Sequence, residues 1–191
     1  MLPFQPGPAP HLPTSGEVSY FPGLEVVMAQ QTQKKTDDRT SITRERLVEL
    51  LNEDLAREYQ AIIAYVVYSQ VLKGAPYMTI AGELEKHARQ ELDHALIIAK
   101  QIDYLGGMPT VTPRPVKNSD DAEEMLRFDM DNENETVRNY RERIRQCEGL
   151  GENALAEHIR EILVQEQEHQ IDLATALGKD VAEVTSGEER A

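Results

Sequence analysis

Two short segments of the sequence carry metal-binding residue types at the same spacing. Glu91 and His94 are three residues apart, and so are Glu166 and His169. Residues three apart on a helix lie on one face, about one turn from each other. Carboxylate oxygens and imidazole nitrogens are both common metal ligands, so each segment could supply two ligands to one site.

A further glutamate precedes each segment at the same distance. Glu58 lies 33 residues before Glu91, and Glu133 lies 33 residues before Glu166. Each member of the first set is followed 75 residues later by a residue of the same type. The repeat predicts two similar halves and one centre built from six ligands, which are Glu58, Glu91, His94, Glu133, Glu166 and His169.

Four helices must position these ligands, because apolar residues recur at helical spacing in four segments. Glycine or proline ends each segment. The predicted helices span about residues 43–73, 77–105, 120–148 and 152–177, with Thr43 and Ser119 as the N-caps of the first and third.

The connection between the second and third helices, residues 106–118, contains three prolines and is not helical. Extended at ~3.3 Å per residue, it reaches roughly 43 Å. A helix of about 28 residues is roughly 42 Å long. The connection can therefore run the full length of a bundle and leave the third helix parallel to the second. The sequence predicts an all-α four-helix bundle with one long crossover.

Each of the four glutamates lies near the middle of its helix, so the six ligands should meet at one level of the core. Burying unpaired carboxylates is costly, and no Arg or Lys lies on the apolar stripes to balance them. Two divalent cations would neutralise four carboxylates. Oxygen-rich ligation with two imidazoles favours iron or manganese over structural zinc.

Three kinds of residue near the predicted centre have less defined roles. His87 lies one turn before Glu91 and could be an accessory ligand or a hydrogen-bond partner of a ligand. Its counterpart in the repeat is Ile162, so we favour the interpretation that His87 is a polar residue at the boundary of the core. Tyr65 and Tyr140 are again 75 residues apart and could pack in the core, hydrogen-bond a metal ligand or donate an electron. Cys147 is expected to be a small buried hydrophobe.

The composition excludes several classes of protein. The formal net charge is −14 and the isoelectric point is near 4.8, so the surface should repel nucleic acids and anionic membranes. One cysteine excludes a disulfide framework. The longest apolar stretch, residues 61–68, is too short to span a bilayer. We expect a cytoplasmic protein.

The chain divides into three predicted parts. Residues 1–40 are predicted to be a disordered N-terminal extension, because the first part is rich in Pro and Gly and has no apolar period. Residues 1–27 are expected to be dispensable. Residues 41–178 form the predicted bundle, and residues 179–191 form a polar tail.

These patterns resemble bacterioferritin, within the ferritin-like superfamily of di-iron proteins. The resemblance covers about residues 42–177, which include all four predicted helices. It depends on four segments, whose sequences are LNEDLAREYQAI at 51–62, ELDH at 91–94, EEMLR at 123–127 and EQEHQID at 166–172.

The resemblance implies a ferroxidase that holds two iron ions per subunit and oxidises Fe²⁺ to Fe³⁺ with O₂ or peroxide. By position, Glu58 and Glu133 would each be the terminal carboxylate of one iron. Glu91 and Glu166 would bridge the pair. His94 and His169 would each bind one iron, and Tyr65 would lie beside the site. Ferric mineral would collect in a homo-oligomeric shell, with twenty-four subunits favoured and twelve as the alternative.

Leu92 departs from the pattern of haem-carrying bacterioferritins, which have a methionine directly after the first bridging glutamate. Leucine has no sulfur to ligate iron. The sequence therefore predicts that no haem binds between subunits.

Other readings share the same ligands. A mini-ferritin of the Dps-like group would form a twelve-subunit shell, and a di-iron hydroxylase would need an apolar substrate channel. Rubrerythrin requires a cysteine-ligated iron that one Cys cannot supply. A bundle acting only as an iron reservoir would not need all six ligands.

Overall fold

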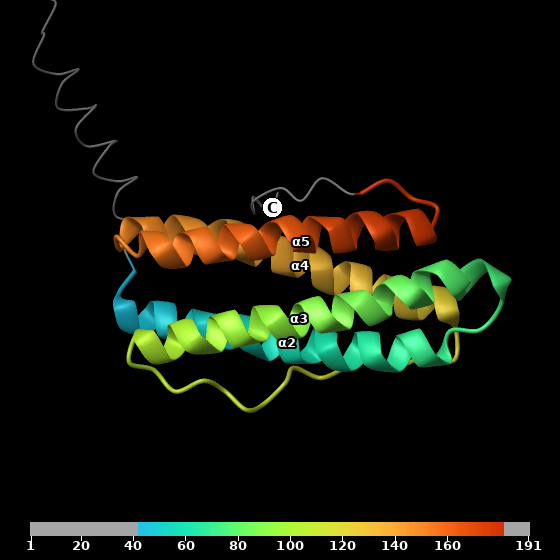
Figure 1. The fold of residues 1–191 in the computed structure, drawn as a ribbon, viewed down its shortest axis with the longest axis horizontal. Helices are drawn as coiled ribbons and strands as arrows, with labels where there is room; N and C mark the ends of the chain where they lie inside the picture. The colour runs from blue at the N-terminus through green and yellow to red at the C-terminus, as the bar shows by residue number, and fades with distance from the viewer. Residues whose placement is uncertain (1–41, 182–191) are drawn as a thin grey trace, which may run out of the picture. The chain divides into compact units, whose positions relative to one another are not determined.

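The computed structural model describes residues 42–181. Within them the chain forms four long helices, one 3₁₀ turn and no strand, so the prediction of an all-α four-helix bundle is confirmed (Figure 1). The predicted extension at residues 1–40 and the tail beyond residue 181 lie outside the described residues. The elements are α2 (Arg44–Val71), η1 (Ala75–Tyr77), α3 (Met78–Tyr104), α4 (Ala122–Gly149) and α5 (Asn153–Ala176).

The helix starts follow the sequence signals, with one correction. Thr43 caps α2 as predicted, and its side chain accepts a hydrogen bond from the backbone N–H of Arg46 at 3.2 Å. The cap of α4 is Asp121, so the prediction of Ser119 is wrong by two residues. Asp121 accepts the N–H of Glu124 at 2.7 Å, whereas Ser119 accepts the N–H of Asp121 and holds the turn before the helix.

The crossover runs along α2, as its length predicted (Figure 1). At its start a Cβ on Gly107 would collide with Val48 and Ile102, so glycine allows the chain to turn closely over α2 and α3. Successive turns of α2 then hold the segment by hydrogen bonds. These join Asn52 to Met108 and Thr110, Ala56 to Arg114, Gln60 to Pro115, and Tyr68 to Lys117.

The order of these contacts fixes the direction of α4. Later residues of the crossover contact later residues of α2, so the segment runs parallel to α2. It therefore brings the chain to the end of the bundle where α3 begins, and α4 runs parallel to α3, as expected.

The apolar core consists of two clusters, with the predicted ligands between them in the chain. One cluster includes Leu51, Ile98 and Cys147, and the other includes Leu84 and Leu126. Cys147 is fully buried, as expected, and burial raises the pKa of its thiol to about 12. Among the described helices, none is both long enough and apolar enough to cross a bilayer.

Candidate metal centre

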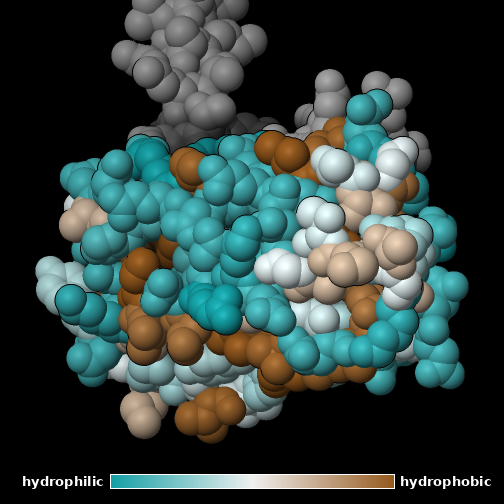
Figure 2. All heavy atoms as spheres, turned by 45° about the vertical axis from the view of Figure 1, so that its right-hand side comes forward, coloured by the Kyte–Doolittle hydropathy of each residue, from teal (hydrophilic) through white to brown (hydrophobic). Residues whose placement is uncertain are grey.

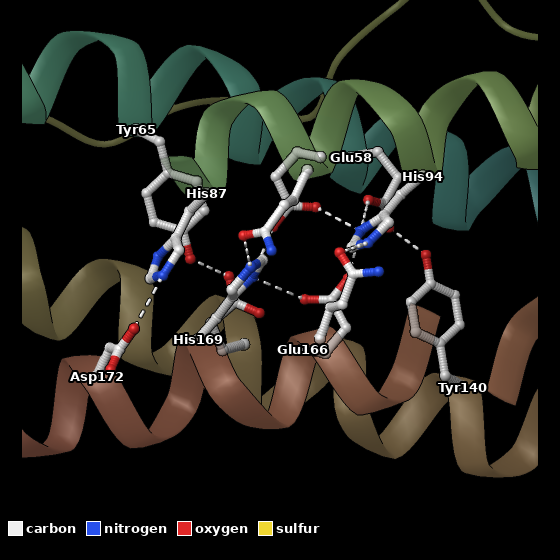
Figure 3. Close-up of polar contacts among 12 residues, drawn as sticks. Glu58, Tyr65, His87, His94, Tyr140, Glu166, His169 and Asp172 are labelled. Atoms are coloured by element: carbon white, nitrogen blue, oxygen red, sulfur yellow. Dashed lines mark hydrogen bonds and ion pairs between the residues drawn. The ribbon is translucent and has the colours of Figure 1, made fainter. Parts of the chain in front are cut away.

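A buried layer of charged side chains occupies the middle of the bundle (Figure 3). The structure brings together all six ligands predicted from the repeat, each at most 2% exposed. Their ligand atoms form two groups, in each of which all atoms lie within 4.8 Å of one another. One group is Glu58, Glu91, His94 and Glu166, and the other is Glu91, Glu133, Glu166 and His169.

The two groups share Glu91 and Glu166, which come from α3 and α5. Each group adds one glutamate and one histidine of its own. This arrangement provides two neighbouring positions for metal ions, each with three carboxylates and one imidazole within reach. It has the form expected for two bridging and two terminal carboxylates.

The donor atoms that face this layer lack other partners. Among the predicted ligands, the buried oxygens without a hydrogen bond are Glu58 Oε2, Glu91 Oε1, Glu133 Oε2 and both carboxylate oxygens of Glu166. His169 Nδ1 lies 2.9 Å from Glu91 Oε1, yet neither atom makes a hydrogen bond of acceptable geometry. Unpaired buried carboxylates are costly, and cations held between them remove that cost. The residues present therefore fit a pair of metal ions.

Two glutamines that the sequence analysis missed orient the imidazoles. Gln165 Oε1 lies 3.3 Å from His94 Nε2, and Gln90 Oε1 lies 3.0 Å from His169 Nε2. An amide oxygen only accepts hydrogen bonds, so each Nε2 carries the proton and donates it. When the ring loses its second proton, Nδ1 is left with its lone pair toward the carboxylates. The signal was present, because both glutamines directly precede a shared glutamate.

Two tyrosines bind the two glutamates that the groups do not share. The Tyr65 hydroxyl donates to Glu133 Oε1, and the Tyr140 hydroxyl donates to Glu58 Oε1. Burial, and then the charges of the neighbouring carboxylates, raise the pKa of both tyrosines well above the usual value, so both remain protonated donors. Of the roles considered from sequence, hydrogen bonding to a predicted ligand is confirmed for both.

Protons balance the charge of the centre when no metal is bound. Burial, and then the charges of Glu91 and Glu166, raise the pKa of Glu58 well above its usual value. Burial and the same two charges raise the pKa of Glu133. Burial opposes protonation of the two imidazoles, but close contact with the neighbouring carboxylates outweighs it, raising the pKa of His94 strongly and that of His169 to about 9.

His87 is buried beside the centre, so its interpretation as a boundary residue is wrong. The residue is 3% exposed, and its ring stacks on that of His169 with centroids 4.0 Å apart. Its ring makes an edge-to-face contact with that of Tyr65, and Nε2 lies 3.1 Å from Asp172 Oδ2 (Figure 3). The rings of its neighbours cover the imidazole, and Asp172 satisfies one nitrogen. These contacts allow a histidine to be buried here, whereas the repeat has Ile162 at the equivalent position.

Two buried arginines lie beside the apolar stripes and were missed for that reason. Arg143 holds the carboxylate of Asp54 through Nε at 2.7 Å and Nη2 at 3.2 Å. Arg57 pairs with Glu135. The two arginines therefore have partners other than the predicted ligands.

The chain is similar to several proteins of known family. It is 25% identical to a bacterioferritin of Brucella melitensis over 142 residues, which cover 71% of this chain and 88% of the relative. A ferritin-like, diiron-carboxylate protein from Bacillus anthracis shares its fold with a TM-score of 0.68 and 34% identity, over 72% of this chain and 99% of the other.

A second solved structure is a dodecameric thioferritin, a bacterioferritin-related protein from Bacteroides fragilis. It aligns with a TM-score of 0.65 and 26% identity, over 76% of this chain and 93% of the other. The sequence profile of the Ferritin-like domain matches residues 48–181, which include all six predicted ligands. The chain therefore belongs to the ferritin-like family, and its resemblance to bacterioferritin is confirmed.

Proposed function

We propose that the protein oxidises Fe²⁺ to Fe³⁺ with O₂ or peroxide and stores the product in a shell made of its own copies. The observation that carries the proposal is the pair of buried ligand groups that share Glu91 and Glu166. Their unpartnered oxygens point to a centre built to hold two cations side by side. Iron suits this set of carboxylates and imidazoles.

Each half of the centre binds Fe²⁺ with its own glutamate and histidine. Glu58 and His94 serve one position, and Glu133 and His169 serve the other. Glu91 and Glu166 hold both positions at a fixed separation. Two bound iron ions together supply two electrons to the oxidant. The protein residues orient the ions, exclude bulk water from the buried layer and keep the tyrosine hydroxyls as donors.

A small hollow between α2 and α4 gives access to the carboxylates. It is lined by four of the predicted ligands together with Arg57, Asn132 and Thr136. The hollow has room for little more than one water molecule, so it offers no space for an organic substrate. This favours iron oxidation over a di-iron hydroxylase, which would need a channel for an organic substrate.

An apolar surface on α2 and α3 supports assembly into a shell. Exposed aliphatic side chains there include Ile63, Val66, Leu92 and Leu96, between 41% and 63% exposed. Figure 2 shows hydrophobic groups gathered over the lower part of the molecule, the side on which α2, α3 and the crossover lie in Figure 1. Apolar surface of this kind is typically buried between subunits.

We expect a shell of twenty-four subunits, with twelve as the alternative, and a cytoplasmic location. The dodecameric assembly of the related protein from Bacteroides fragilis makes the smaller shell a specific second candidate. The two assemblies would share the same chemistry. The mass of the purified particle distinguishes them.

We expect no haem in this shell. Leu92 is half exposed on the apolar surface of α3, and its side chain offers no atom that ligates iron. A Soret band in the purified protein would contradict this expectation.

The test of the proposal is the aerobic oxidation of Fe²⁺ by the wild type and by Glu91→Ala and His169→Ala. Both variants are expected to lose the rapid phase of oxidation, because each removes a ligand of the centre. Asp93→Ala is the matched control, since this exposed carboxylate lies between Glu91 and His94 on α3. Particle mass is measured in parallel. Oxidation by both ligand variants at the wild-type rate would overturn the proposal.

A further inference from the structure

A second group of potential ligands borders the centre on its α3–α5 side. Glu83 and His87 come from α3, and Asp172 comes from α5. Their ligand atoms lie within 4.8 Å of one another, the same limit that the two groups of the centre satisfy. Two carboxylates and one imidazole form a donor set that suits a divalent transition metal.

His87 gives this group a buried and oriented donor. Only 4% of the side chain is exposed. One ring nitrogen, Nε2, faces Asp172, and the other, Nδ1, has no hydrogen-bond partner. Nε2 is therefore the nitrogen that can bind a cation held by Asp172, and Nδ1 can then keep the proton of the ring. Stacking on His169 holds the ring in place.

The other two ligands connect the group to solvent. The side chain of Asp172 is 41% exposed and that of Glu83 is 32% exposed, whereas the ligands of the centre are almost completely buried. Both carboxylate oxygens of Glu83 lie 2.8 Å from Lys86 Nζ. A partly exposed ion pair of this kind contributes little, and a divalent cation would displace the lysine.

The group exists in only one half of the repeat. The counterparts of Glu83, His87 and Asp172 at the 75-residue offset are His158, Ile162 and Ile97. Two aliphatic residues at these positions remove any equivalent site from the other half. The three ligands are therefore not a by-product of the repeat that builds the centre.

We infer that Glu83, His87 and Asp172 bind a third divalent cation and hold Fe²⁺ at the surface before it reaches the centre. Two parts of this inference rest on the proposed function, which are the identity of the cation as Fe²⁺ and its transfer to the centre. The existence of the third site does not. The stacked rings of His87 and His169 place the third ion next to a predicted ligand of the centre, with partial exposure that allows it to exchange.

The test uses Co²⁺ as the probe, without oxygen, and the full chain in its native assembly. Crystals soaked with Co²⁺ are expected to show three anomalous peaks per subunit, with the third at ligand distance from His87. Asp172→Asn should lose the third peak and keep the other two, and in solution it should weaken the third binding step about tenfold or more. Glu161→Gln, an exposed carboxylate on the same helix, is the matched control and should keep all three.

Two results would overturn the inference. The first is a wild-type crystal that shows the two Co²⁺ peaks of the centre but no peak beside His87. The second is a crystal of Asp172→Asn in which the third peak is unchanged. Glu91→Ala separates the two proposals, because it should lose the paired peaks and keep the peak at His87. At limiting Fe²⁺, Asp172→Asn should also oxidise iron more slowly than Glu161→Gln, with equal rates at saturating Fe²⁺. Equal rates at all concentrations would overturn the transfer role.

Discussion

The two halves of the bundle, α2–α3 and α4–α5, are alike at the centre and different around it. Each half supplies two glutamates and one histidine at the same spacing. The residues that contact those ligands also repeat, because Tyr65 and Tyr140 bind opposite glutamates and Gln90 and Gln165 bind opposite histidines. Each partner reaches across from the other half of the molecule.

The next layer of buried polar residues does not repeat. Asp54 and Asp129 are related by the 75-residue offset, and both are buried. Asp54 binds Arg143, whereas the counterpart of Arg143 is Tyr68, whose hydroxyl donates to the carbonyl of Lys117. Asp129 Oδ2 has no hydrogen-bond partner, and burial, followed by the charge of Glu91, raises the pKa of Asp129 well above its usual value.

The difference separates two kinds of constraint. The proposed function needs like donors for two like ions, so residues that bind or orient the ligands should match in both halves. Beyond them, a buried polar group only has to be neutral or paired, and each half can meet that need with different residues. The asymmetric layer is also where an additional function can arise, as we propose for His87.

The two halves should each release protons when metal binds, and this is the largest effect that we expect. Without metal, we expect each half to hold one proton on its unshared glutamate and one on its imidazole, because the pKa values of Glu58, Glu133, His94 and His169 are all raised. Two divalent ions should displace about four protons per subunit. The combined affinity should then fall about 10⁴-fold for each unit decrease in pH, since each proton contributes about tenfold.

Above neutral pH the halves should diverge. The pKa of His169 is about 9, and that of His94 is raised further. As the pH rises through 9, His169 loses its proton before any metal binds. The number of protons released on metal binding should therefore drop from about four toward three. Calorimetry of Mn²⁺ binding in buffers of different ionisation enthalpy measures the number. A release of one proton or fewer at pH 7 would contradict the charge balance derived for the centre.

The sequence predicted the six ligands because they obey the repeat and lie on the apolar stripes of their own helices. It also predicted the crossover, since thirteen residues with three prolines can span a bundle but cannot form a helix. It did not predict the roles of Arg143 and His87, because the partners that make burial possible, Asp54 and Asp172, lie on other helices. Pairing across helices depends on how they pack, which no spacing along one helix reveals.

The next largest effect should come from breaking the asymmetric layer. Arg143→Leu leaves the buried carboxylate of Asp54 without its partner, and removing one member of a buried pair costs about 3–5 kcal/mol of unfolding free energy. Tyr68→Phe, at the counterpart position, removes one hydrogen bond to a carbonyl and should cost about 1 kcal/mol. Urea unfolding of the metal-free protein measures both. Equal losses would show that the two positions are equivalent after all.

A double substitution sharpens this comparison. Asp54→Leu combined with Arg143→Leu removes both charges and should recover most of the stability that Arg143→Leu alone loses. A double variant no more stable than Arg143→Leu would mean that packing, rather than the unpaired carboxylate, causes the loss.

The smallest effects should come from the matched glutamines, and they should be equal in the two halves. Gln90→Leu leaves His169 Nε2 without its acceptor, and Gln165→Leu does the same to His94. Loss of the residue that orients a metal-binding histidine typically weakens metal affinity about 10–100-fold, or roughly 1.4–2.7 kcal/mol. Each variant should weaken one of the two ions, as measured by anaerobic Co²⁺ titration. A loss of affinity more than tenfold larger for one variant than for the other would mean that only the ligands are alike in the two halves. A smaller loss for Gln90→Leu would indicate that the stacked His87 orients His169 instead.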